Sequence, residues 1–313
     1  MPTLLSSMLL CTLFAWLLFG IVTAKSYRWV QPTLLNIDPD QASKLILGWL
    51  SLPPLGALTT TAVMYSPDLT QWLVAGHCHN GSCQQHGPQS ALAIWPTAIL
   101  ASWICLSIGR CLLRQWLSLR HLSAELSRAG RNAGAYGQLD DPQPAAFTLG
   151  WFNPKIFITT GMQSACSDQD IDCILAHERA HRDRLDNLRL LTAWLFTAPL
   201  PRSWSTAVLD DLRLSCEKAS DLNAAQVSSR ESVAAALIRI ARLQRPASPA
   251  GSLAFAGTQT ERRIRALLEE PVAALPNEYV FASVSTALLV ILVIINPLHR
   301  AIEFLAQVGV LGS

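Results

Sequence analysis

Four apolar stretches constrain the fold of this chain more than any other feature of its sequence. Each has close to the roughly 20 residues that a helix needs to cross the hydrocarbon core of a bilayer, and none contains a charged side chain. They are residues 4–24, 45–65, 91–109 and 279–298. Only 15% of the chain is charged, against about a quarter in a soluble domain. The sequence therefore predicts a mainly α-helical integral membrane protein with four transmembrane helices. The first stretch could instead be a signal peptide, but it is long and lacks a basic start, which favours a retained helix.

Lysine and arginine predict the orientation of these helices, because basic loops stay in the cytoplasm. The loop 67–89 contains neither residue. Lys25 and Arg28 lie in the loop expected at 25–43, and Arg110, Arg114 and Arg120 follow the third stretch, which places both segments inside. We expect both termini outside and the long segment between the third and fourth stretches inside. The predicted organisation has a three-helix membrane region at 1–113, a cytoplasmic domain at 114–278, and a fourth helix with a short external tail at 279–313.

Two cysteines, Cys78 and Cys83, lie in the predicted external loop, where they could form a disulfide or stay as free thiols. Metal binding with the neighbouring His77 and His79 is the weaker alternative. The net charge of +2 gives no reason to expect direct binding of nucleic acid.

The cytoplasmic segment alternates short strand signals with helical ones. Residues around Asn153 and Pro154 predict a hairpin that pairs 146–151 with 155–160. The preceding residues, 131–144, read as a loop. One long helix is expected from an N-cap at Ser167 to the turn at 199–201. Three further helices are expected at 203–226, 231–244 and 258–270.

The five residues HERAH, 177–181, carry the clearest chemical signal. On a helix, His177 and His181 lie one turn apart on the same face and can bind one metal ion. Glu178 lies beside the first histidine and can act as a general base on a metal-bound water. This is the HExxH pattern of zinc peptidases.

A catalytic zinc ion needs a third protein ligand and one open position. The segment CEKASD supplies Glu217, which can complete a His₂Glu set. Asp221 lies one helical turn further and could accept the outer N–H of a ligand histidine. A polar, solvated helix face is the alternative explanation for each of these residues. Cys173 and Cys216 are the candidates for a fourth ligand if the zinc site is structural.

These motifs resemble the BlaR/MecR family of membrane metallopeptidases. The resemblance rests on HERAHRDRLDNL, the following Pro-Leu turn, EKASD and the hairpin GWFNPKIFITTG. It implies a gluzincin-like zinc metallopeptidase domain in a bacterial inner membrane. The implied Zn²⁺ ligands are His177, His181 and Glu217. Glu178 is the implied base, and Asp221 the carboxylate that supports a ligand histidine. Ser220 stands where the family usually has Cys. Because few residues follow the fourth stretch, we do not expect the family's penicillin-binding sensor domain.

The favoured function is therefore a membrane-embedded zinc endopeptidase that cleaves a cytoplasmic or membrane-adjacent protein. The resemblance implies antirepressor-type regulation, with a transcriptional repressor or the protease itself as substrate. We expect the strand near 155–160 to offer an edge to an extended substrate. Arg262 and Arg263 are the candidates for stabilising the oxyanion. Two alternatives remain: a quality-control or CAAX-type HExxH protease, and a non-catalytic signalling receptor with a structural zinc site.

Overall fold

The computed structural model describes residues 2–66, 94–132, 136–243, 256–269, 274–276 and four single residues beyond them. The loop that contains Cys78 and Cys83 lies outside the described residues. So does nearly all of the fourth apolar stretch, 279–298. The candidate disulfide and the fourth transmembrane helix therefore stay predictions.

Three described helices are long and apolar enough to cross a membrane, at Met8–Leu35, Pro39–Tyr65 and Ala98–Ser118. They belong to α1 (Pro2–Leu35), α2 (Pro39–Tyr65) and α4 (Ile94–Ala129). The expected loop at 25–43 is wrong, because α1 continues to Leu35 and α2 begins four residues later. The Asp38 carboxylate caps α2 by accepting from the backbone N–H groups of Asp40 and Gln41. At 34 residues, α1 is about 50 Å long and extends well beyond a hydrocarbon core of about 30 Å.

A small sheet follows α4. Its strands are β1 (Gly130–Asn132), β2 (Gly137–Leu139), β3 (Ala146–Leu149) and β4 (Lys155–Thr159), in the order β1-β2-β4-β3. The antiparallel pair β3 and β4 confirms the predicted hairpin. The loop expected at 131–144 instead contributes two residues of β1 and the whole of β2, which runs parallel to β4. The expectation of an edge at 155–160 is wrong, since β4 is paired on both sides and the edge strands are β1 and β3.

Six described helices complete the fold: α5 (Thr160–Ala165), α6 (Asp168–Arg184), α7 (Asp186–Thr197), α8 (Arg202–Val227), α9 (Arg230–Leu243) and α10 (Ala256–Leu268). Ser167 caps α6 in a capping box with Asp170, as its position predicts. The single long helix expected from there to the 199–201 turn is wrong. Leu185 adopts a left-handed backbone conformation, with φ of 54°, and separates α6 from α7.

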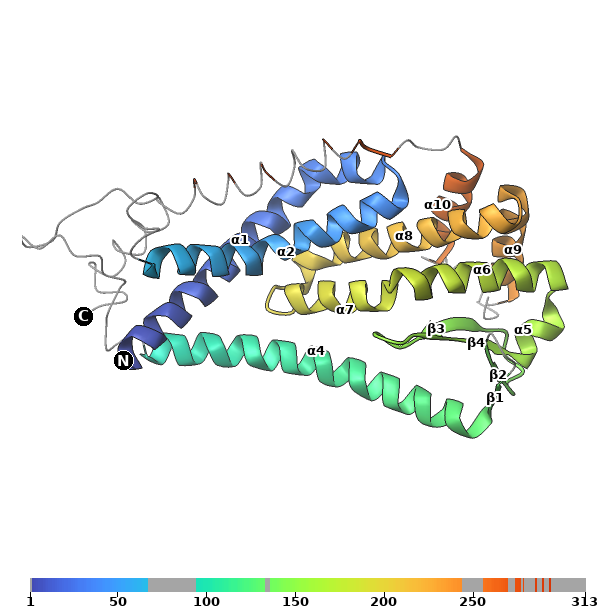
Figure 1. The fold of residues 1–313 in the computed structure, drawn as a ribbon, viewed down its shortest axis with the longest axis horizontal. Coiled ribbons are helices and arrows are strands. Elements are labelled where there is room, and N and C mark those ends of the chain that lie inside the picture. The colour runs from blue at the N-terminus through green and yellow to red at the C-terminus, as the bar shows by residue number, and fades with distance from the viewer. Residues whose placement is uncertain are drawn as a thin grey trace, which may run out of the picture.

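The C-terminal half of α1 and the N-terminal half of α2 share one hydrophobic core with α7 and α8. Tyr27 and Ile46 from the first pair pack in the same cluster as Ala193 and Leu212 from the second. The Tyr27 hydroxyl also donates to the buried Asp211 carboxylate at 3.0 Å. Figure 1 shows α7 and α8 running lengthwise beside α2, with the small sheet beneath α6 at the opposite end from the N-terminus. The membrane helices and the helical domain are therefore packed as one unit along this interface.

Candidate metal centre

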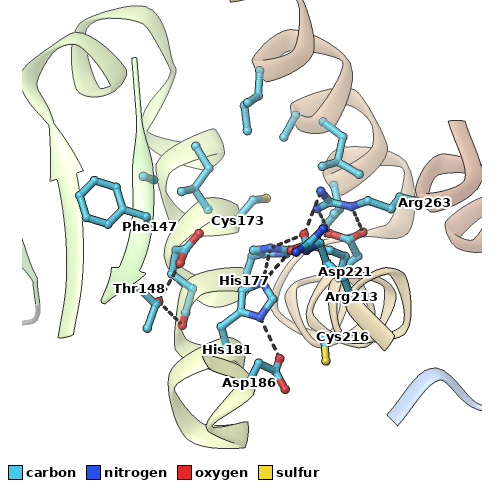
Figure 2. Close-up of a pocket in the computed structure, with 18 of the residues that line it drawn as sticks. Phe147, Thr148, Cys173, His177, His181, Asp186, Arg213, Cys216, Asp221 and Arg263 are labelled. Carbon is cyan, nitrogen blue, oxygen red and sulfur yellow. Dashed lines mark hydrogen bonds and ion pairs between the residues drawn. The ribbon is translucent and has the colours of Figure 1, made fainter. Parts of the chain in front are cut away.

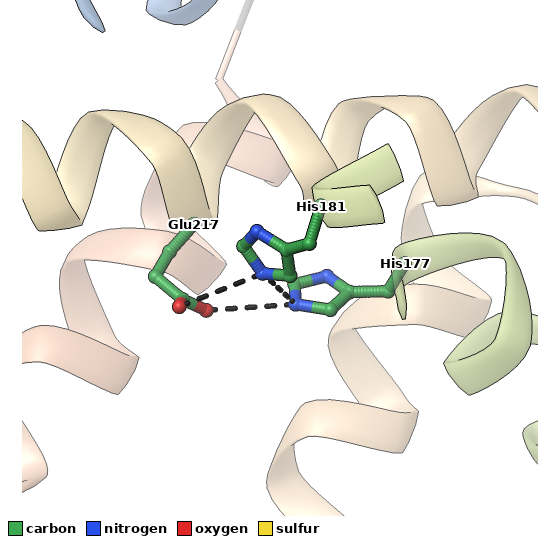
Figure 3. Close-up of side chains that lie close together, drawn as sticks. All are labelled: His177, His181 and Glu217. Carbon is green, nitrogen blue, oxygen red and sulfur yellow. Dashed lines mark hydrogen bonds and ion pairs between the residues drawn. The ribbon is translucent and has the colours of Figure 1, made fainter. Parts of the chain in front are cut away.

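Three side chains from two helices bring their donor atoms together. His177 and His181 extend from successive turns of α6, and Glu217 faces them from α8 (Figure 3). The two Nε2 atoms are 3.0 Å apart. The Glu217 carboxylate oxygens lie 3.5 Å from Nε2 of His177 and 3.6 Å from Nε2 of His181. Among the described residues, this is the group of donor atoms that could hold a metal ion.

The spacing of these donors fits a tetrahedral zinc ion. Zinc binds imidazole nitrogen and carboxylate oxygen at about 2.0–2.2 Å, so two donors of one tetrahedron lie about 3.3–3.5 Å apart. The observed separations of 3.0, 3.5 and 3.6 Å lie around that value. Two nitrogens and one oxygen are also the donor set of catalytic zinc sites that keep a fourth position open.

Each histidine has a buried carboxylate at its other ring nitrogen. Asp221 lies 2.9 Å from Nδ1 of His177, and Asp186 lies 2.8 Å from Nδ1 of His181. An acceptor at Nδ1 fixes the tautomer that leaves Nε2 free to bind a metal. The sequence singled out Asp221 for this position but not Asp186. Asp186 reaches His181, five residues earlier in the chain, because the left-handed turn at Leu185 interrupts the helix between them.

Arginines hold both of these carboxylates. Arg263 of α10 donates two hydrogen bonds to Asp221, at 2.8 and 2.7 Å, and also contacts Glu217 at 2.9 Å. Its guanidinium is therefore engaged with the site's own carboxylates rather than free to meet an oxyanion. Arg262, the other candidate, is exposed.

A second arginine pair links Asp186 to the start of α2. Arg184 and Arg189 both approach the Asp186 carboxylate at 3.3 Å. The same two side chains donate to the hydroxyl of Ser43, and Arg184 pairs with Asp40 at 2.7 Å. A continuous chain of polar contacts therefore runs from the N-terminal turn of α2 to a candidate metal ligand.

The surrounding charges shift the ionisation of the metal-free site. Burial disfavours the charged form of His177, but Asp221 and Glu217 outweigh it and raise the pKa of that imidazole to about 10. Burial opposes ionisation of Glu217, yet its hydrogen bond with His177 and the charge of Arg263 hold its pKa well below the usual range. At neutral pH the metal-free site therefore holds a protonated His177 beside an ionised Glu217.

Glu178 is buried beside these ligands and belongs to the same cavity. The hydroxyl of Thr148, on the edge strand β3, donates to its carboxylate at 2.7 Å. Asn187 in turn donates to the backbone carbonyls of Thr148 and Gly150. Neither Thr148 nor Asn187 was singled out from the sequence, because contacts between a strand and a later helix leave no local pattern.

The site opens into a cavity of about 360 Å³ between the sheet and helices α6, α8 and α9 (Figure 2). Apolar side chains of α9, among them Val233, Leu237 and Ile240, form part of its lining. Arg213 also lines it, one helical turn before Glu217 on α8. A cavity of this volume, with the candidate metal ligands on one face and apolar side chains on another, suits one side chain of a larger substrate.

The two candidate structural ligands do not join the metal-binding group. Cys173 is buried and lies 3.0 Å from the hydroxyl of Ser228. Burial raises the pKa of the Cys216 thiol to about 12, which disfavours the thiolate that zinc requires. The donor set among the described residues thus has three members rather than the four of a closed structural site.

One comparison with known proteins is informative. Residues 118–271, just under half of the chain, match peptidase family M48, a family of zinc metallopeptidases. No curated protein and no solved structure matches the chain. The matched segment includes all the candidate metal ligands. Together with three helices that could span a membrane, it indicates a membrane-associated metallopeptidase. The match does not single out the narrower BlaR/MecR resemblance.

Proposed function

We propose that this protein is a membrane-embedded zinc endopeptidase. The observation that carries the proposal is the arrangement of His177, His181 and Glu217, with separations suited to one zinc ion, beside a buried carboxylate that is not part of the donor set. That carboxylate, Glu178, is the residue type that a hydrolytic site needs as a base. A structural zinc site would have no use for it.

Zinc, when bound, would lower the pKa of a bound water towards 7 and polarise the carbonyl group of the substrate. Glu178 takes up the proton of the attacking water and passes it to the leaving amine. Thr148 holds that carboxylate in place through its hydroxyl. Asp221 and Asp186 keep the two imidazoles in the metal-binding tautomer. Arg213 replaces Arg262 and Arg263 as our candidate for stabilising the oxyanion. It lines the cavity, and its ion-pair partner among the described residues is the exposed Asp210, at 3.6 Å.

The substrate is proposed to bind as an extended segment beside β3. This strand has a free edge among the described residues, and its Thr148 contacts the proposed base. Asn187 already occupies the carbonyl group of Thr148 and that of Gly150, just after the strand, which limits backbone pairing to the other positions of β3. The apolar lining from α9 favours an apolar side chain next to the cleaved bond.

Within this activity, the BlaR/MecR resemblance favours antirepressor-type regulation, with a cytoplasmic repressor or the protease itself as the substrate. The proposed location is the bacterial inner membrane, with the peptidase domain in the cytoplasm. A quality-control or CAAX-type protease would use the same metal set. For that reason the identity of the substrate, rather than the metal, separates these roles.

The test is a comparison of protein fragments in cells that carry the wild-type chain or Glu178→Gln. Asp183→Asn serves as the matched control, since Asp183 is an exposed carboxylate on the same helix that pairs with Arg182. We expect fragments of one or a few proteins to disappear only in Glu178→Gln. Identical fragments in all three strains would overturn the proposal.

Orientation needs a separate test. A reporter that works only in the cytoplasm should be active when fused after residue 130 and silent when fused after residue 80. The expectation rests on Arg110, Arg114 and Arg120, set against a loop at 67–89 without Lys or Arg. The reverse pattern would place the peptidase domain outside.

A further inference from the structure

A second cavity, of about 560 Å³, lies away from the metal centre, between α4 and the turn that joins α7 to α8. Its walls carry apolar side chains from both sides, including Trp103, Trp194 and Leu209. The indole N–H of Trp103 donates to the backbone carbonyl of Pro199 at 3.3 Å, which fixes the turn against α4. The cavity is therefore formed jointly by α4, which could span a membrane, and by α7 and α8, which lie in the segment that matches the peptidase family.

The turn between α7 and α8 lies at the depth of the membrane helices. The Leu200 side chain packs on Gly20 of α1 so closely that an added Cβ would meet it at 2.6 Å. Gly20 precedes Lys25, the first basic residue of α1, by five positions, which is about 7.5 Å along a helix. Trp103 precedes Arg110, the first basic residue of α4, by seven positions, or about 10 Å. On both helices, the residue that contacts the turn therefore lies closer to the predicted membrane core than the first basic residue of that helix.

Three arginines line the same cavity: Arg110 and Arg114 from α4, and Arg202 from the first turn of α8. No acidic side chain is among the described residues that line it. None of the three forms an ion pair with a described carboxylate. In addition, Pro201, the N-cap of α8, offers no side-chain acceptor to the first N–H groups of that helix. Cations without acidic partners beside an uncapped helix start favour an anionic ligand.

We propose that this cavity binds the headgroup of an anionic phospholipid, with its phosphate on Arg110, Arg114 and Arg202 and its acyl chains beside Trp103 and Leu200. The guanidinium groups match phosphate oxygens geometrically. The depth of the turn and the apolar walls favour a lipid over a free anion, because a free phosphate would leave the apolar part of the cavity unfilled. Basic pockets between membrane helices are suited to such headgroups. The inference does not depend on the peptidase activity.

The test uses the purified full chain, stripped of lipid in a neutral detergent and titrated with soluble short-chain phosphatidylglycerol. The variant Arg110→Gln/Arg114→Gln/Arg202→Gln should bind the lipid about a hundredfold more weakly. This factor assumes that each arginine contributes as much binding free energy as a basic residue does at an anionic membrane surface. The matched control removes three exposed arginines elsewhere, on α9 and α10: Arg242→Gln/Arg262→Gln/Arg265→Gln. It should bind like the wild type.

Three further arms make the result specific. Replacing the cavity arginines with lysine should restore part of the affinity, since the charges return without the guanidinium geometry. Short-chain phosphatidylcholine should bind more weakly than phosphatidylglycerol, because it carries no net charge. Inorganic phosphate at matched ionic strength should not displace the lipid. Equal lipid binding by the glutamine variant and the wild type would overturn the proposal. So would equal binding of the two lipids, or displacement by inorganic phosphate, which would assign the cavity to a soluble anion.

Discussion

Replacing Asp186 with Asn should weaken zinc binding without unfolding the protein. The Asp186 carboxylate is 2% exposed and lies 2.8 Å from Nδ1 of His181. Asparagine keeps the shape and one acceptor oxygen, but it removes the negative charge that supports the imidazole when zinc is bound. Losing such a carboxylate behind a ligand histidine typically costs 10–100-fold in metal affinity, which corresponds to about 1.4–2.7 kcal/mol.

The fold should persist because the two arginines at Asp186 have other partners. Arg184 keeps its ion pair with Asp40, and both Arg184 and Arg189 keep their hydrogen bonds to Ser43. The variant therefore leaves neither buried arginine without a partner, a change that would cost considerably more stability. A melting temperature close to that of the wild type would verify this.

The assay is competition for zinc between the purified protein and a chromophoric chelator. Asp183→Asn is the control, since its carboxylate is exposed on the same helix and does not contact either histidine. Asp221→Asn should lose at least as much affinity as Asp186→Asn, because it also releases Arg263, which then competes with the metal for Glu217. Wild-type affinity in Asp186→Asn would refute the role assigned to this carboxylate.

Two further predictions concern protons and packing. Because the pKa of His177 is raised to about 10 in the metal-free protein, zinc must displace its proton at neutral pH. Calorimetry in buffers of different ionisation enthalpy should show about one proton released per zinc, with affinity rising as pH rises towards that pKa; no release at neutral pH would contradict the assignment. Gly161→Ala should lower the melting temperature, since a Cβ would lie 2.1 Å from the backbone oxygen of Pro142, and overpacking of this kind costs about 1–3 kcal/mol. Gly48→Ala, where a Cβ meets no atom within 4 Å, is the control. Equal melting temperatures for Gly161→Ala and Gly48→Ala would contradict the prediction and show that the backbone around Pro142 moves to accommodate the added methyl group.

The sequence predicted the features that depend on local spacing. Two histidines four residues apart on a helix must share a face, and the capping box joins Ser167 to Asp170, only three residues later. The hairpin around Asn153 and Pro154 was predicted for the same reason, since its turn residues lie between two short strand signals.

Features that depend on tertiary contacts were missed. A leucine at position 185 does not predict a left-handed backbone conformation, because glycine or asparagine usually occupies it. Without that turn, nothing in the sequence points Asp186 towards His181. The strand β2 is three residues long and pairs with β4 across intervening chain, so its own sequence could not reveal it. The edge strand was misjudged as a consequence.

The extent of α1 was underestimated for a related reason. Hydropathy marks where a membrane core ends, not where a helix ends. The polar continuation of α1 remains helical because Tyr27 and Gln31 bind Asp211 of α8, a contact that only the folded chain supplies.

The central claim is that the site is a catalytic zinc centre, and Glu178→Gln tests it most directly. Glutamine keeps the size of the side chain and can still accept from the hydroxyl of Thr148, but it cannot take up a proton. The measurement pairs the zinc content of the purified variant with its rate of peptide hydrolysis, on a substrate identified by the fragment comparison or on the chain itself. We predict a full complement of zinc and a rate lowered by at least the 10²–10⁴-fold that a general base contributes. A zinc-loaded Glu178→Gln protein that hydrolyses as fast as the wild type would contradict the account.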